Sequence, residues 1–146
     1  MTEREEVSAV MDKMVAHMNV HDLEACVACY SEDAELQDPR FPEPVHGRDY
    51  VRQGFKYWFD AFPDVKIVVL NKIIDGPKVA IEWTFEATHL GEYLGVQGSG
   101  GKFKVLAAAH FEVHGGKVTR DLSLFDASAL RMLETLAAET APSARQ

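Results

Sequence analysis

The chain has 146 residues, of which 47% are hydrophobic and 26% are charged, and its formal net charge is −8. This length and balance suit one globular domain over residues 1–146, and the acidic charge disfavours binding to nucleic acid and to anionic membranes. No apolar run approaches the roughly 18 residues of a membrane span, and "MTEREEVSAV" has no secretory pattern, so we expect a cytoplasmic protein.

Apolar residues at helical spacing predict two helices near the N-terminus. Segment 3–19 carries one apolar stripe, formed by Val7, Val10, Met11, Met14, Val15 and Met18. Asp22 is positioned to cap a second, short helix that carries Leu23, Cys26, Val27 and Tyr30. The C-x-x-C spacing of Cys26 and Cys29 is compatible with a redox or zinc site, but two buried small apolar residues are the simpler interpretation.

A short strand and a third helix follow. Ala34, Leu36 and Asp38 alternate on one face of a strand that Pro39 ends, and "RFPEPVHG" reads as a loop. From about residue 48 to residue 62 a helix carries Val51 and several aromatic residues, and Pro63 stops it.

The second half of the chain has the period of strands. We expect strands at about 65–74, 79–89, 103–113 and 117–125, with a tight hairpin at "HGG" and a last short helix through Leu130, Leu133 and Leu136. Helices gathered early and antiparallel strands gathered late predict an α+β fold. The expected architecture is a curved antiparallel sheet on which the N-terminal helices form a cone-shaped barrel around one pocket.

Large and small residues are distributed as a pocket would require. The expected ligand-binding wall is aromatic and consists of Trp58, Phe59, Phe62, Trp83, Phe85 and Phe125, while the facing strand has small residues at Ala107 and Ala109. Such a space suits a small apolar organic ligand held by a few polar groups. The alternative is a fully packed core, because aromatic stripes are commonly core.

Several segments resemble a known family. They are "SEDAELQDP" (31–39), "HGRDYVR" (46–52), "WFDAFPD" (58–64), "EWTFEATHLGEYLG" (82–95), "FEVHGGKV" (111–118) and "LFDASALRMLE" (124–134). In this order they resemble the SnoaL-like polyketide cyclases of the nuclear transport factor 2-like superfamily. The resemblance implies a cone fold, often a dimer, no metal and no organic cofactor. It leaves the reaction open, because the superfamily includes cyclases, isomerases, epoxide hydrolases and binding proteins.

Two polar residues face the expected pocket. Asp38 shares a strand face with Ala34 and Leu36, so its carboxylate would be partly desolvated and suited to acid–base catalysis; the alternative is an aspartate that caps a turn before Pro39. His89 shares a face with Trp83 and Phe85 and could donate a hydrogen bond or transfer a proton, although it also suits a loop anchor at a strand end.

The last strand carries the third acid–base candidate. Asp121 and Ser123 share a face, and Asp121 is the expected catalytic residue with Ser123 as its hydrogen-bond partner. The resemblance implies a catalytic aspartate two residues further on, where this chain has Ser123. This departure argues against aldol cyclisation, since two residues correspond to about 7 Å along a strand.

Three functions remain open from the sequence. The first is a cofactor-free cyclase or isomerase on a small carbonyl compound, carried by Asp38, His89 and Asp121. The second is a binding protein with the same pocket and no chemistry. The third is epoxide hydrolysis, ranked last because Arg120 falls on the opposite face from Asp121. We also expect a homodimer through the outer sheet face, where His110, Leu106 and Ala108 would lie.

Overall fold

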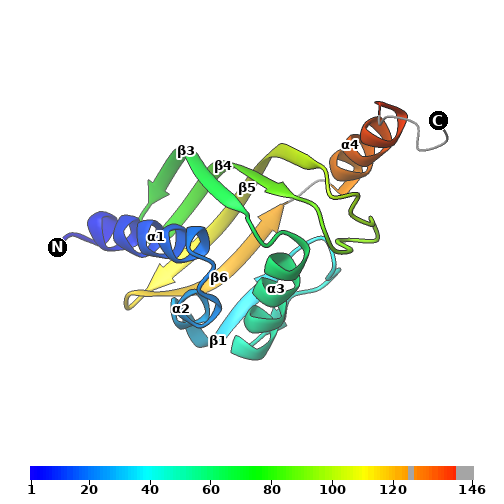
Figure 1. The fold of residues 1–146 in the computed structure, drawn as a ribbon. Helices are drawn as coiled ribbons and strands as arrows, with labels where there is room; N and C mark the ends of the chain where they lie inside the picture. Colours follow the sequence, from blue (N-terminus) through cyan, green and yellow to red (C-terminus); the bar gives the residue numbers. More distant parts are fainter. Residues whose placement is uncertain (125–126, 141–146) are drawn as a thin grey trace.

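Four helices and six strands make up the computed structural model, which describes residues 1–124 and 127–140 (Figure 1). The helices are α1 (Glu3–Asn19), α2 (Leu23–Ala28), α3 (Arg48–Ala61) and α4 (Ala127–Thr140). The strands are β1 (Tyr30–Gln37), β2 (Val45–His46), β3 (Lys66–Asp75), β4 (Lys78–Thr88), β5 (Lys102–His114) and β6 (Lys117–Leu124). The expected α+β class is confirmed.

The six strands form one curved sheet that does not close into a barrel. Their order is β2-β1-β6-β5-β4-β3, and successive hairpins make β3, β4, β5 and β6 antiparallel. The pair β1–β6 is parallel, and the chain passes through β2, α3 and the strands β3 to β5 between its two members. In Figure 1, α1 crosses one side of the sheet and α3 lies beyond β1 on the same side, so these two helices cover its concave face.

Local sequence signals explain where the helices begin. Thr2 and Glu5 form a capping box at the start of α1, and the Asp22 carboxylate accepts from the backbone N–H of Ala25 at the start of α2. The stripe of α1 buries Val7, Met11, Met14 and Met18 against the sheet. Burying such a stripe is the main source of helix stability in a protein of this size.

Asn19 attaches the end of α1 to the sheet. Its side-chain amide accepts a hydrogen bond from the N–H of Ile67 at 2.7 Å and donates one to the carbonyl of the same residue at 3.1 Å. The backbone N–H and carbonyl of Ile67, near the start of β3, are thereby both hydrogen-bonded. These two bonds fix the C-terminal end of α1 against β3.

The expected second helix was too long. Tyr30 is the first residue of β1, because α2 ends at Ala28 with the backbone N–H of Cys29 bonded to the carbonyls of Cys26 and Val27. Both cysteines are free and buried, in agreement with their interpretation as small apolar residues.

The hairpin at "HGG" is confirmed, and a bulge follows it. Gly115 and Gly116 both have positive φ (58° and 74°), as a two-residue turn of this hand requires. The β5–β6 register shifts between Glu112 and Val113, so Val118 and Asp121 both lie on the buried side although they are three residues apart. This bulge decides which residues of β6 face the core.

One expected member of the aromatic wall, Phe125, lies outside the described part of the chain. Within the described residues no helix combines the length and apolar character needed to cross a bilayer.

Candidate functional site

A cavity of about 130 Å³ lies between the concave face of the sheet and helices α1 and α3. Its walls are mostly apolar and include Met14, Met18, Trp58, Trp83, Phe85 and Phe111. Polar side chains reach it from four segments, namely β1, the loop after it, β6 and the loop after β4; they are Tyr30, Asp38, Arg40, Tyr93, Asp121 and Ser123. A few polar groups in an apolar space are the usual composition of a small-molecule site.

Asp121 is the buried acid of this cavity. It lies in β6 with 5% of its surface exposed, and both carboxylate oxygens accept hydrogen bonds. The Tyr30 hydroxyl donates to Oδ2 at 2.5 Å and the Ser123 hydroxyl donates to Oδ1 at 2.6 Å. Burial raises the pKa of Asp121 to about 6, although both hydrogen bonds favour the ionised form and so oppose this shift. The carboxyl is therefore able to exchange a proton near neutral pH.

Tyr30 is a member of this group that sequence reasoning placed on a helix. Its side chain is almost fully buried, and burial together with the charge of Asp121 raises the pKa of its hydroxyl well above the ordinary value. The phenol therefore remains a donor. The alternation of residues 30–37 could have indicated that Tyr30 begins a strand. The pairing of that strand with β6, which brings Tyr30 to Asp121, is not visible in the sequence.

Asp38 is at the mouth of the cavity and forms an ion pair with Arg40. Arg40 Nε donates to both carboxylate oxygens, at 3.0 and 3.2 Å, and Nη2 donates to Oδ2. The Arg40 backbone N–H also donates to Asp38 Oδ1 at 2.9 Å. Asp38 is thus both a cavity-lining residue and the turn-capping residue considered as the alternative.

Asp38 and Asp121 are brought close together by the parallel pair of strands. Leu36 of β1 is opposite Asp121 of β6, and Asp38 follows two residues later on the same face. The charge of Asp38 contributes to the raised pKa of Asp121, as expected for like charges near one another. Two of the three predicted acid–base residues therefore share the cavity.

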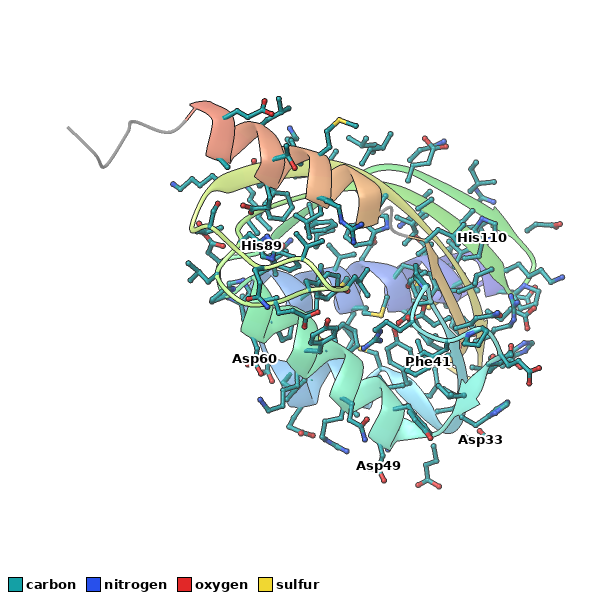
Figure 2. All side chains as sticks on the ribbon, turned by 90° about the vertical axis from the view of Figure 1, so that its right-hand side faces the viewer. Asp33, Phe41, Asp49, Asp60, His89 and His110 are labelled. Carbon is teal, nitrogen blue, oxygen red and sulfur yellow. The ribbon has the colours of Figure 1, made fainter. Side chains whose placement is uncertain are left out.

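His89 does not line this cavity. Its ring is fully buried between Phe62 and Phe103, and its Nδ1 is 2.9 Å from Oε1 of Glu134 in α4. Figure 2 shows His89 below α4, on the opposite side of the view from Phe41, which adjoins Arg40. The face was predicted correctly, but the residue is at the end of β4 away from Asp121.

Only some of the residues predicted to form the aromatic wall line the cavity. Trp58, Trp83 and Phe85 line the cavity, as does Ser123, whereas Phe59 and Phe62 are not among its lining residues. Phe62 is instead fully buried and packs against Phe85 and Phe103.

Arg40 is the second residue that the sequence analysis missed. Its guanidinium lies 4.9 Å from the ring centre of Phe41 and 5.3 Å from that of Tyr57. Arg120, by contrast, bonds to Glu35 at 2.8 Å on the outer side of the sheet, as expected. A basic residue two positions after a strand-end aspartate was the available signal for Arg40.

The described residues contain no group of three or more histidine, cysteine, aspartate or glutamate side chains placed to hold a metal ion.

Comparisons with known proteins agree with this architecture. A family model described as SnoaL-like polyketide cyclase matches residues 8–132. AclR of Streptomyces galilaeus, a proposed hydroxylase, is 26% identical with a TM-score of 0.75, and the match covers 94% of this chain and 98% of AclR. IdmH of Streptomyces antibioticus, a proposed polyketide cyclase, is 22% identical with a TM-score of 0.74, over 90% of this chain and 98% of IdmH. A proposed SnoaL-like polyketide cyclase from Jannaschia sp. CCS1 is 18% identical with a TM-score of 0.76, over 95% and 94% of the two chains.

Proposed function

The chain belongs to the SnoaL-like polyketide cyclase family, and from that premise we propose that its cavity performs cofactor-free acid–base chemistry on a small apolar carbonyl compound. The observation that supports this proposal is a buried carboxyl, Asp121, whose pKa of about 6 lies close to physiological pH. A catalytic base is most effective when its pKa is near the working pH.

The proposed roles follow from the hydrogen bonds. Asp121 takes a proton from the carbon next to the substrate carbonyl and returns it to the product. Tyr30 and Ser123 hold the carboxylate in one orientation. Asp38 forms an ion pair with Arg40, whereas Asp121 has only hydroxyl partners, so the two aspartates are proposed to have different roles. His89 is proposed to anchor α4 through Glu134 and not to touch the substrate.

The test measures proton exchange, because exchange does not require knowledge of the natural substrate. Phenylacetone in D₂O serves as the probe, and NMR follows deuterium incorporation next to its carbonyl. The protein should accelerate exchange above the buffer rate, increasingly as pH rises through about 6. Asp121→Asn should reduce the protein-catalysed rate by about 100-fold or more.

The matched control is Asp60→Asn, since Asp60 is exposed on α3 and pairs with Lys56. It should exchange the probe at the wild-type rate. An Asp121→Asn protein with full activity would remove the assignment. Saturable binding of phenylacetone without exchange would instead support the alternative, a binding protein with the same cavity.

Epoxide hydrolysis is a second candidate, because an arginine and two aspartates line this cavity. The arginine is Arg40 and not Arg120, and it pairs with Asp38 beside Asp121. Styrene oxide in ¹⁸O-labelled water is the probe. Formation of labelled diol that Asp121→Asn abolishes would favour this chemistry over proton exchange, and unchanged epoxide would exclude it for this probe.

We also propose a homodimer through the outer face of the sheet. Exposed and half-buried side chains align across its strands in two rows, because Val68, Thr84 and Leu106 are in register, as are Ile73, Ala80 and His110. Leu106 is 69% exposed and Ile73 is 55% exposed, and Figure 2 shows His110 on the side away from the helices. An apolar surface of this kind is typical of an interface.

Sedimentation tests the dimer. Leu106→Glu should convert the protein to monomers, whereas Leu90→Glu, at a similarly exposed leucine after β4, should not. A wild-type protein that sediments as a monomer at high concentration would contradict the interface. The cytoplasmic location and the single domain over 1–146 stay predictions from the sequence.

A further inference from the structure

We infer that Arg40 binds the substrate oxygen that becomes negatively charged in the reaction, and that the cavity accepts a compound with one ring beside that oxygen. This inference rests on the proposed function and names the substrate class of the same site. A carbonyl compound that loses a proton next to its carbonyl becomes an enolate, and the enolate oxygen needs a hydrogen-bond donor.

Arg40 is the only cationic side chain that lines the cavity among the described residues. The other polar side chains of the lining are two carboxyls, two phenols, one hydroxyl and two indoles, from Asp38, Asp121, Tyr30, Tyr93, Ser123, Trp58 and Trp83. The Tyr30 and Ser123 hydroxyls already donate to Asp121. The guanidinium is the donor in this set that also carries a positive charge, which favours binding of an anionic oxygen.

The contacts of Arg40 fix its orientation and leave one nitrogen available. Nε and Nη2 are used by Asp38, and Nη1 has no hydrogen-bond partner within the part of the chain that the structure describes. The guanidinium packs on Phe41 and Tyr57, and the Arg40 side chain is only 22% exposed. A planar cation held by an ion pair and aromatic rings loses little entropy when it binds an oxygen.

The volume of the cavity sets the size of the substrate. About 130 Å³ is close to the engineered cavity of about 150 Å³ that binds benzene, and far below the roughly 300–1,000 Å³ of sites for larger ligands. The aromatic side chains Trp58, Trp83 and Phe85 line its apolar part. One ring fits against them, with its oxygen toward Arg40 and the adjacent carbon toward Asp121.

The step balances without any further reactant. The Asp121 carboxylate removes a proton, so a C–H bond breaks and an O–H bond forms on the carboxyl. The electron pair moves to the carbonyl oxygen, where Arg40 Nη1 donates a hydrogen bond to it. Return of the proton to the same or the conjugated carbon restores the carboxylate and the carbonyl.

The competing explanation is that Arg40 only neutralises Asp38. The probe that separates the two is 4-nitrophenolate, which carries one ring and an anionic oxygen, and whose absorbance reports binding. The measurements use the Asp121→Asn background, because its side chain is neutral as Asp121 would be after taking the proton. Circular dichroism verifies the fold of each variant.

If Arg40 binds the oxygen, Arg40→Met should weaken 4-nitrophenolate binding by about 10- to 100-fold. Asp38→Asn should tighten binding, because it releases the guanidinium. The combined Asp38→Asn and Arg40→Met variant should remain as weak as Arg40→Met alone. The matched control Arg52→Met removes an exposed arginine of α3 that pairs with Glu24 and should change nothing.

Three results would overturn the inference. They are a combined variant that recovers the affinity of the Asp121→Asn background, no binding of 4-nitrophenolate by that background, or tighter binding of the three-ring probe 1-hydroxyanthraquinone. Because this experiment measures binding alone, its failure is distinguishable from failure of the exchange assay on phenylacetone.

Discussion

Replacement of Asp121 by asparagine should stabilise the protein at neutral pH but have little effect in acid. The pKa of Asp121 is raised from the ordinary 3.8 to about 6 in the folded state, mainly by burial. Between these two values the folded protein binds a proton that the unfolded chain has lost, so the free energy of unfolding falls as pH rises. Asparagine has no charge to bury and avoids this loss.

The size of the effect follows from the shift of the pKa. A rise of the pKa from 3.8 to about 6 corresponds to about 3 kcal/mol of stability, at about 1.4 kcal/mol per pKa unit. Solvent screening reduces this value little, because Asp121 is only 5% exposed. Part of the loss has already occurred at pH 4. The advantage of Asp121→Asn should therefore grow by about 2 to 3 kcal/mol between pH 4 and pH 7.5.

Urea denaturation of both proteins at several pH values measures this difference. Other titrating groups are common to both proteins, so their contributions cancel when the two free energies of unfolding are subtracted. Asp60→Asn, at an exposed aspartate, is the control and should give a nearly constant difference. A difference for Asp121→Asn that stays flat or shrinks with rising pH would refute the account of a desolvated carboxyl.

Two further changes test the surroundings of the cavity. Tyr30→Phe removes a donor to Asp121, so the pKa of Asp121 should rise above about 6 and the pH midpoint of phenylacetone exchange should move upward; an unchanged or lower midpoint would contradict this. Gly98→Ala would place a methyl group 2.4 Å from the carbonyl oxygen of His89, so it should destabilise the fold by about 1–3 kcal/mol in thermal unfolding. Gly101→Ala meets only the Ser99 hydroxyl at 3.1 Å and serves as the tolerated comparison; equal stability of the two variants would argue against the contact.

Elements with a regular period could be predicted from the sequence. The stripe of α1, the cap at Asp22 and the long alternating strands all appear close to their expected bounds. Asp121 and Ser123 were placed on one face, and their hydrogen bond agrees with that placement. These features are local, because a helix or strand repeats over a few residues.

Features that depend on strand pairing could not be predicted. The parallel pairing of β1 with β6 brings Tyr30 to Asp121 across 91 positions of the chain, and no local pattern encodes that contact. The bulge in β6 also breaks simple alternation. Alternation along the strand would place Val118 on the face opposite Asp121, whereas both residues are buried on the same side. Arg40 was missed because its role depends on the position of the loop that carries it.

His89 illustrates a different limit. Alternation along β4 correctly assigned its side chain to the buried face, together with Trp83 and Phe85. It did not specify how far along the curved strand the cavity extends. Six residues after Trp83 the same face is covered by Phe62 and by α4, whose Glu134 bonds to the imidazole.

The two hydrogen bonds on the Asp121 carboxylate have a stereochemical consequence. With Oδ1 held by Ser123 and Oδ2 held by Tyr30, the carboxylate meets a planar enolate from one side only. In the proposed reaction, a hydrogen removed from one carbon would be delivered to the same face of the molecule. Isotope that the carboxyl does not lose to solvent would then migrate within the molecule, and the new centre would form with a single handedness.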